Sequence, residues 1–232
     1  MGWASERLSP VGEMFVEFCA AGECGEASPA LDIGAAFGMA SLAALRAGAW
    51  VIGNDLDAGH LAELERRARE SGLLSRLRLK PGRFPRELDF ENAALGAVHA
   101  SNVFHFLTGN QLREGMRAIA RWLRPEGKLF VQASTPYQAP FAAFVPEFER
   151  RMQAGEKWPG WLEKVSRYSS HRQLGQMPRS IHLLDDRTLR RVVEEAGLEI
   201  ERAWLFRRAD LPSSLHMDGR ESVGVVARNR RE

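Results

Sequence analysis

The residues best suited to bind a ligand lie in the stretch 30–38, where one acid precedes two glycines. Asp32 stands within the apolar run 30–33, and Gly34 and Gly38 follow that run. Glycine lets a backbone approach a ligand closely, and a helix that begins just beyond Gly38 would present free N–H groups. The stretch therefore predicts a strand, a tight turn and a helix start that face a polar ligand.

A second acid, Asp55, follows the next short apolar run, 50–54. A carboxylate at the end of a second parallel strand can accept hydrogen bonds from both hydroxyls of a ribose, which predicts nucleoside binding. The dinucleotide fingerprint G-x-G-x-x-G is absent, because the glycines follow the acid as Asp32-x-Gly34-x-x-x-Gly38.

This pattern resembles motif I and the second-strand acid of class I S-adenosylmethionine-dependent methyltransferases. The segment 100–107 is similar to that family's motif after strand four, and 123–129 is similar to its turn before strand five. The resemblance extends over most of the chain. It implies an α/β fold with a doubly wound, seven-stranded, mostly parallel sheet, helices on both faces and an antiparallel pair at the end. It also implies S-adenosyl-L-methionine as the cofactor.

Carried over residue by residue, the resemblance places Gly34, Ala36 and Gly38 in the turn beneath the methionine part of the cofactor. Asp32 would brace that turn and the cofactor's amino group. Many family members have glycine where this chain has Ala36. If that position needs a positive φ, its methyl group costs about 1 kcal/mol or more.

On the adenosine side, the resemblance implies that Asp55 binds the ribose hydroxyls and that Leu56 lies against the adenine. Arg83 and Phe84 stand where the family often has an acid that accepts from the adenine amino group. Arginine cannot accept a hydrogen bond, so Phe84 is left to supply packing and stacking. Asn102, after the fourth strand, is also placed in the cofactor site.

Methyl transfer from a sulfonium is an in-line displacement, so the protein chiefly holds the acceptor and the methyl group in line. His105, just past strand four, is the first candidate for a general base; the alternative is a structural role at the following helix start. Weaker candidates are Tyr137, His171 and His182. Ser101 and the segment 132–134 supply no carboxylate for a hard cation, so we expect no metal.

Hydrophobic periodicity and capping signals predict alternating strands and helices, which favours a parallel sheet with right-handed crossovers. Ser9 and Pro10 open the first helix as N-cap and first helical residue. Further helices are predicted over 39–47, 57–71, 110–123 and 186–196, and strands over 30–33, 50–54, 77–79, 95–100, 129–133, 198–206 and 222–227.

The chain is interpreted as one domain, 1–232, with an N-terminal helical segment, 1–28, and an insertion, 134–182, between strand five and the following helix. Pro146 interrupts the helical spacing of the insertion and predicts a kinked or restarted helix. Long connections in compact domains are often binding loops, so the insertion and its Trp158 and Trp161 are a candidate cap over the acceptor. A structural embellishment or a dimer contact is the alternative.

Composition indicates which binding partners and which cell compartment to expect. The 232 residues carry a net charge of +2, and the basic residues are dispersed among acids, so nucleic acid is an unlikely partner. No apolar run approaches the roughly 18 residues that span a bilayer, and the first residues do not resemble a signal peptide, so we expect a cytoplasmic protein. Cys19 and Cys24 are expected to be reduced packing residues. Monomer and homodimer both remain open.

Together these features predict a metal-independent S-adenosylmethionine-dependent methyltransferase that acts on an oxygen or nitrogen of a small molecule. The alternatives are an RNA or protein methyltransferase, a non-catalytic cofactor-binding protein and an unrelated nucleotide-binding function. Enzymes that methylate exocyclic base amines usually carry Asn/Asp-Pro-Pro-aromatic after strand four, and the segment 101–104 lacks both prolines.

Overall fold

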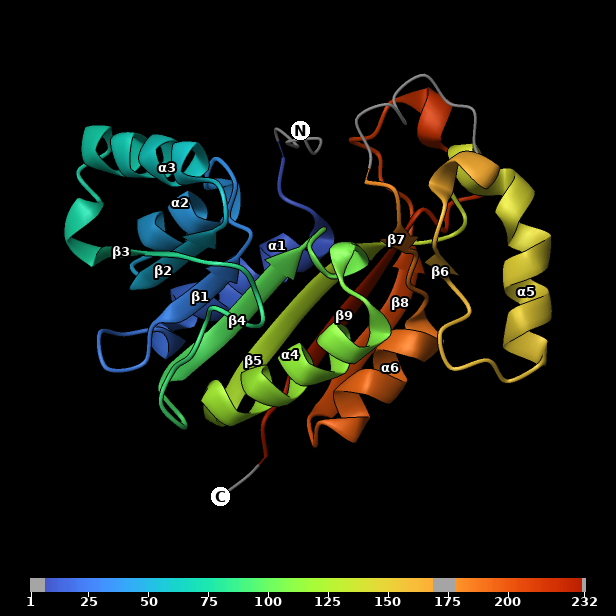
Figure 1. Ribbon diagram of the computed structural model, residues 1–232. Coiled ribbons are helices and arrows are strands. Elements are labelled where there is room, and N and C mark those ends of the chain that lie inside the picture. The colour runs from blue at the N-terminus through green and yellow to red at the C-terminus, as the bar shows by residue number, and fades with distance from the viewer. Residues whose placement is uncertain (1–6, 169–177, 231–232) are drawn as a thin grey trace.

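A seven-stranded sheet forms the centre of the computed structural model, which describes residues 7–168 and 178–230 (Figure 1). The strands lie in the order β3-β2-β1-β4-β5-β9-β8, and β9 is antiparallel to both of its neighbours. The pairs β1–β2, β1–β4, β2–β3 and β4–β5 are parallel. The bounds are β1 (Ala30–Ile33), β2 (Val51–Asp55), β3 (Leu77–Pro81), β4 (Leu95–Ser101), β5 (Leu123–Ser134), β8 (Glu199–Phe206) and β9 (Ser222–Arg228). The predicted doubly wound, mostly parallel sheet is confirmed.

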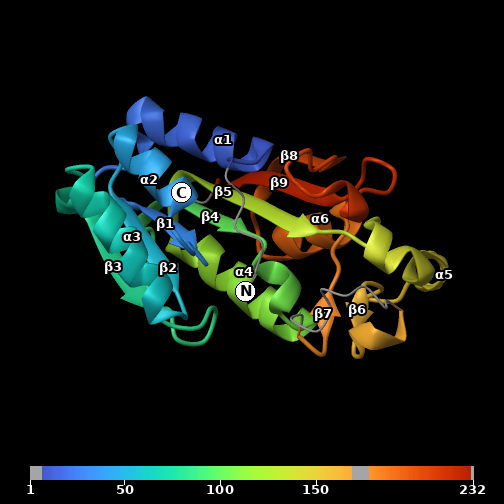
Figure 2. The same cartoon turned by 90° about the horizontal axis from the view of Figure 1, so that it is seen from above.

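Helices cover both faces of this sheet (Figure 2). One face packs against α1 (Pro10–Phe18), α2 (Met39–Arg46) and α3 (Ala58–Glu70), and the other against α4 (Gly109–Trp122) and α6 (Asp186–Glu195). No helix among the described residues is long and apolar enough to cross a membrane.

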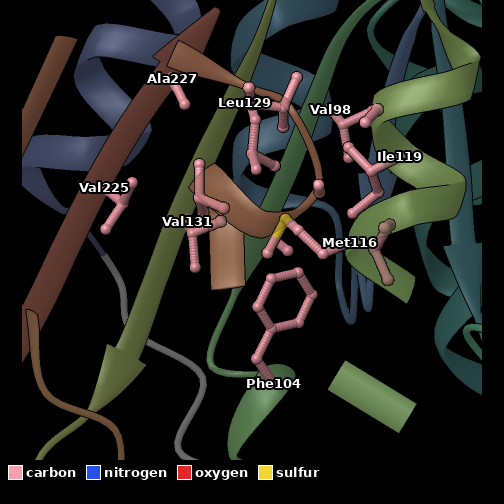
Figure 3. Close-up of a cluster of buried hydrophobic side chains, with 14 of the residues drawn as sticks. Val98, Phe104, Met116, Ile119, Leu129, Val131, Val225 and Ala227 are labelled. Carbon is pink, nitrogen blue, oxygen red and sulfur yellow. The ribbon is translucent and has the colours of Figure 1, made fainter. Parts of the chain in front are cut away.

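Successive side chains of β5 point to opposite faces and so feed two hydrophobic cores. Leu129 and Val131 pack toward α4 and α6, in the cluster that Figure 3 shows with Met116 and Ile119. Phe130 points the other way and packs edge-on against Phe15 of α1, with ring centroids 5.7 Å apart. This alternation fixes which polar side chains of β4 and β5 lie beneath α1.

Side chains cap the helix starts, and Ser9 does so as predicted. Ser9 Oγ accepts a hydrogen bond from Gly12 N at 3.1 Å, and Asp57 Oδ1 accepts one from Gly59 N at 2.8 Å. Thr108 caps α4 in a reciprocal arrangement with Gln111. Each cap satisfies N–H groups that the first helical turn leaves without a partner.

Strand β5 begins earlier than predicted, at Leu123 instead of residue 129. The predicted turn, 123–129, is bonded to β4 and to the end of β9. Leu123 pairs with Leu95 of β4, and Asn229 N, just after β9, donates to Gly127 O at 2.9 Å. Glu126 takes a positive φ of 62° within it. The parallel pairing with β4 shifts register here, from Leu95–Leu123 to Ala97–Lys128, so the predicted turn forms an irregularity within β5.

The segment 134–182 contains a 3₁₀ turn, η4 (Ala139–Phe144), the helix α5 (Val145–Gln153) and two short paired strands, β6 (Trp161–Leu162) and β7 (Ile181–His182). Pro146 lies in the first turn of α5, so the helix restarts there as predicted. The described part of this segment has a hydrophobic cluster of its own that includes Phe144 and Phe148. In both views α5 lies at the β8 side of the sheet, away from α2 and α3 (Figures 1 and 2).

Candidate cofactor and acceptor site

The turn after β1 has the backbone geometry that the glycine pattern predicts. Gly34, Ala36 and Gly38 all have positive φ, at 67°, 47° and 80°. A Cβ on Gly34 would lie 2.4 Å from Val103 Cγ2, and one on Gly38 would lie 2.3 Å from Leu64 Cδ1. Both glycines are therefore required by close packing as well as by conformation. Ala36 carries the strain expected of a left-handed alanine, about 1–2 kcal/mol.

Asp32 braces this turn from below. Its side chain is buried, Oδ2 accepts a hydrogen bond from Ser41 Oγ at 2.6 Å, and Oδ1 lies 2.7 Å from His99 Nδ1. Because both oxygens are engaged inside the domain, the geometry supports the predicted bracing role. It does not support a direct contact with the cofactor's amino group.

Asp55 ends β2 beside the same turn. Oδ2 accepts from Ala36 N and Oδ1 accepts from Asp57 N, both at 2.9 Å. These bonds join the turn after β1 to the carboxyl end of β2 and fix the orientation of the carboxylate. Each oxygen keeps further lone-pair capacity, since a carboxylate accepts about four hydrogen bonds.

Exposed apolar side chains follow the strands that end at this edge of the sheet. Four of the five large apolar side chains that are exposed in the described part of the chain follow β1, β2 or β4, the strands whose carboxyl ends meet here: Phe37, Met39, Leu56 and Phe106. Leu56 is 72% exposed, in the position predicted to lie against an adenine. Exposed apolar surface next to convergent hydrogen-bonding groups fits a flat heterocycle attached to a sugar.

The side chains of the neighbouring residues Arg83 and Phe84 lie in different environments. Arg83 is exposed in the loop after β3, near the adenine end of the site, and its N–H donates to Glu87 Oε2 at 2.8 Å. Phe84 is buried in the core, where its ring stacks on Phe104 with centroids 5.7 Å apart and meets Trp122 edge-on. This corrects the predicted cofactor contact of Phe84, which packs the interior because its side chain points away from the sheet edge.

The segment after β4 lies against the glycine turn. Asn102 has a positive φ of 56°, and its N–H donates to Gln132 O at 2.9 Å. Its Oδ1 is buried and has no hydrogen-bond partner among the described residues. Since Val103 touches Gly34, the structure brings Asn102 to the same edge of the sheet as the motif I turn.

His105 is buried, and its Nδ1 has no hydrogen-bond partner in the described structure. Burial lowers the pKa of this imidazole to about 4. The ring is therefore neutral near pH 7, where it accepts a hydrogen bond but is a weaker base than an ordinary histidine.

The other base candidates lie in or beside the inserted segment. Tyr137 is buried, and the Arg220 guanidinium lies 3.5 Å from its ring centroid. His182 is fully buried, and its Nδ1 lies 3.2 Å from Leu107 O. His171 lies outside the described residues.

Trp158 and Trp161 both pack edge-on against His182, with centroids 5.3 and 5.8 Å apart. They line an open cleft of about 810 Å³ between the inserted segment and the start of α4, where Gly109 has no room for a Cβ beside the Trp158 ring. None of the predicted cofactor residues lines this cleft. The tryptophans thus lie near the segment that follows β4, but not over Gly34 or Asp55.

Sequence reasoning missed three polar residues at or beneath this edge. His99 pairs with Asp32 and stacks on Phe15 with ring centroids 4.8 Å apart. His60 has Nδ1 3.3 Å from Asp55 Oδ1. Gln132 is buried beneath the α1 face. Its Nε2 donates to Ser101 Oγ at 3.3 Å, and its Oε1 has no partner among the described residues.

No group of three or more His, Cys, Asp or Glu side chains that could hold a metal ion occurs within residues 7–168 and 178–230. Cys19 and Cys24 are both buried and both free. A hydrogen bond with the neighbouring Cys24 thiol, together with burial, raises the pKa of Cys19.

Acid is expected to destabilise the fold through His105 and His182. Burial lowers the pKa of each to about 4, against about 6.5 in an unfolded chain. Between these pH values the unfolded state binds more protons than the folded state. The contribution of each histidine to the free energy of unfolding is therefore fully present above pH 6.5 and is lost as the pH falls toward 4. The expected loss from pH 7 to pH 5 is about 2 kcal/mol per histidine. Urea unfolding at the two pH values measures it.

The matched variant for this prediction is His182→Gln, which removes one titrating group. Its free energy of unfolding should depend less on pH than that of the wild type, whatever its absolute stability. An unchanged pH dependence would show that His182 does not titrate differently in the two states.

Residues 30–127 match the sequence model of a family described as a methyltransferase domain. The matched residues include the glycine turn, Asp55 and the segment after β4. No curated protein sequence matches the chain.

Solved structures share the fold at low sequence identity. An S-adenosylmethionine-dependent methyltransferase from Methanosarcina mazei superposes with a TM-score of 0.69 and 15% identity, over 97% of this chain and 99% of that one. Another from Mesorhizobium loti gives a TM-score of 0.61 and 19% identity, over 90% and 95%. The geranyl diphosphate C-methyltransferase of Streptomyces coelicolor gives 0.62 and 16%, over 94% and 80%. The last was solved with Mg²⁺, geranyl diphosphate and S-adenosyl-L-homocysteine.

Proposed function

We propose that the protein transfers a methyl group from S-adenosyl-L-methionine to an oxygen or nitrogen of a small molecule; the premise is that residues 30–127 match the sequence model of a methyltransferase domain. The observation that carries the proposal is the hydrogen-bonded contact between the turn after β1 and the carboxyl end of β2. There the glycine turn is hydrogen-bonded to the Asp55 carboxylate and lies beside the exposed Phe37 and Leu56.

The residues at this edge fit the proposed cofactor. The turn formed by Gly34, Ala36 and Gly38 has the positive-φ backbone that the glycine pattern predicts, and Asp55 keeps lone pairs for ribose hydroxyls. Leu56 would cover the adenine. When bound, S-adenosyl-L-methionine supplies an electrophilic methyl group. The work of the protein is then to hold the acceptor in line with that group and to exclude water.

We place the acceptor at the neighbouring carboxyl ends of β4 and β5. The buried Oδ1 of Asn102 and Oε1 of Gln132 have no partners among the described residues, and a buried polar group left unpaired costs about 1–3 kcal/mol. An acceptor that donates an O–H or N–H hydrogen bond would satisfy these oxygens and orient its lone pair. His105, neutral near pH 7, is the proposed proton acceptor.

Surface charge supports a small-molecule acceptor over a nucleic acid. Two pairs of adjacent arginines on helix surfaces are matched by nearby acids: Arg66 and Arg67 bond to Glu63, and Arg150 and Arg151 bond to Glu147. These ion pairs leave no basic stripe along α3 or α5 for a phosphate backbone.

The test is transfer of a radioactive methyl group from labelled S-adenosyl-L-methionine to three separate pools: a low-molecular-weight filtrate of cell extract, total RNA and total protein. We expect label in the filtrate, together with formation of S-adenosyl-L-homocysteine. Label in RNA or protein would establish a polymer as the acceptor. No transfer by a protein that binds the cofactor would favour a non-catalytic role. A labelled product methylated on carbon would contradict the proposed acceptor atom.

The inserted segment is proposed to help position the acceptor. If it does, Trp161→Ala should lower turnover more than it lowers affinity for S-adenosyl-L-homocysteine, because the contacts at Gly34 and Asp55 are untouched. Trp161 is preferred to Trp158, which also packs against the main core. The measurement compares kcat with the Kd of the cofactor product.

Trp50→Ala is the matched control, since Trp50 precedes β2 and lies under the Arg78 guanidinium, outside the cleft. Turnover by Trp161→Ala equal to that of this control would remove the cleft from the mechanism.

A further inference from the structure

We propose that His60 is a second ribose-binding residue of this site and acts together with Asp55. The inference rests on the proposed cofactor site and assigns a role to a residue that the glycine turn and the second-strand acid leave out. His60 would donate a hydrogen bond to the ribose hydroxyl whose own hydrogen is donated to the Asp55 carboxylate.

His60 is held in place by the start of α3. Asp57 caps the helix, and its Oδ1 accepts from Gly59 N at 2.8 Å and from His60 N at 3.4 Å. The N–H of Asp57 also donates to Asp55 Oδ1 at 2.9 Å. One short segment therefore fixes the acid and the imidazole relative to each other.

The imidazole also touches the turn after β1. Its ring meets Phe37 edge-on, with centroids 4.8 Å apart. The Arg67 guanidinium lies 5.8 Å from the Phe37 ring centroid. His60 thus lies between the two segments that carry the proposed cofactor contacts, with its side chain 30% exposed at the mouth of the site.

A ring nitrogen without a hydrogen-bond partner lies beside the acid. His60 Nδ1 is 3.3 Å from Asp55 Oδ1, but the pair is not aligned as a hydrogen bond, and the buried Nδ1 has no other partner in the described structure. Backbone N–H groups use one acceptor position on each Asp55 oxygen, which leaves capacity for a ligand.

A hydroxyl group satisfies both residues at once, because it can donate and accept. It donates to the carboxylate, which can only accept, and accepts from the Nδ1–H of His60. An analogue that lacks the hydroxyl leaves the carboxylate and the imidazole without this partner. The pair should therefore discriminate against a deoxyribose more strongly than Asp55 alone.

The experiment is a calorimetric titration with S-adenosyl-L-homocysteine and with its 2′-deoxy and 3′-deoxy analogues. The proteins are the wild type, His60→Ala and His60→Asn, with Glu65→Gln as a control on the exposed surface of the same helix. His60→Ala should bind S-adenosyl-L-homocysteine about 5- to 20-fold more weakly than the wild type. It should also lose most of the discrimination at one of the two hydroxyls. His60→Asn, which keeps an N–H donor, should retain part of that discrimination, and Glu65→Gln should match the wild type.

Two results would overturn the assignment. Unchanged affinity in His60→Ala would show that the imidazole does not contribute to binding. Weaker affinity with full discrimination at both hydroxyls would show that His60 only holds Asp55 in place. Failure of the wild type to bind S-adenosyl-L-homocysteine is a different result, because it would reject the proposed cofactor site itself.

Discussion

Replacing Asp32 by alanine is expected to lower the free energy of unfolding by about 3–5 kcal/mol. The substitution leaves His99 and Ser41 buried without their shared partner, and both side chains are otherwise enclosed. The turn from Gly34 to Gly38 loses its support from below, so cofactor affinity should fall as well. Urea unfolding followed by circular dichroism measures the change in stability.

Asp32→Asn is the control for this substitution, because the amide keeps the volume and one acceptor oxygen. Its loss of stability should be clearly smaller than that of the alanine variant. A loss below about 1 kcal/mol in Asp32→Ala would show that the Asp32–His99 contact is not a major source of stability.

The second large effect is expected at Asp55. Asp55→Ala should weaken binding of S-adenosyl-L-homocysteine by about 1.5–3 kcal/mol, because hydrogen bonds from the ribose to a charged carboxylate are lost. The N–H groups of Ala36 and Asp57 also lose their acceptor, which loosens the turn around the ligand. Titration calorimetry on the folded variant gives the change in affinity.

Asp55→Asn separates the two causes. It retains an acceptor for the backbone but not the charge, so its affinity should lie between those of the wild type and the alanine variant. An unchanged affinity in a folded Asp55→Ala protein would mean that the ribose lies elsewhere.

The sheet and its ligand-binding edge could be predicted because their signals are local. Short apolar runs predict the strands, and the residues directly after them, Gly34, Gly38 and Asp55, predict the ligand-binding turn and acid. The helix caps at Ser9 and Asp57 are equally local signals. The observed strand order then brings the ends of β1, β2 and β4 together.

The features that sequence reasoning missed depend on contacts between distant residues. His99 meets Asp32 because β1 and β4 are neighbours in the parallel register. Phe84 follows β3 but turns into the core toward Phe104, which periodicity cannot show for a single aromatic residue in a loop. His60 looks like a surface residue on its helix until the end of β2 is placed beside it.

The position of the inserted segment also depends on contacts between residues that are distant in sequence. The restart of its helix at Pro146 is a local property and was predicted, whereas its position is set by packing between elements. Trp158 rests on the start of α4, and α5 lies toward the β8 edge, so the segment is offset from the glycine turn (Figure 1). The Trp161→Ala variant tests whether this segment positions the acceptor.

The most direct test of the central claim is calorimetric titration of the wild-type protein with S-adenosyl-L-homocysteine and, separately, with NAD. The joined edge formed by the glycine turn and Asp55 predicts one binding site per chain with micromolar affinity for S-adenosyl-L-homocysteine, and no binding of NAD. Binding of NAD, or no heat of binding for S-adenosyl-L-homocysteine with a folded protein, would contradict the proposed function.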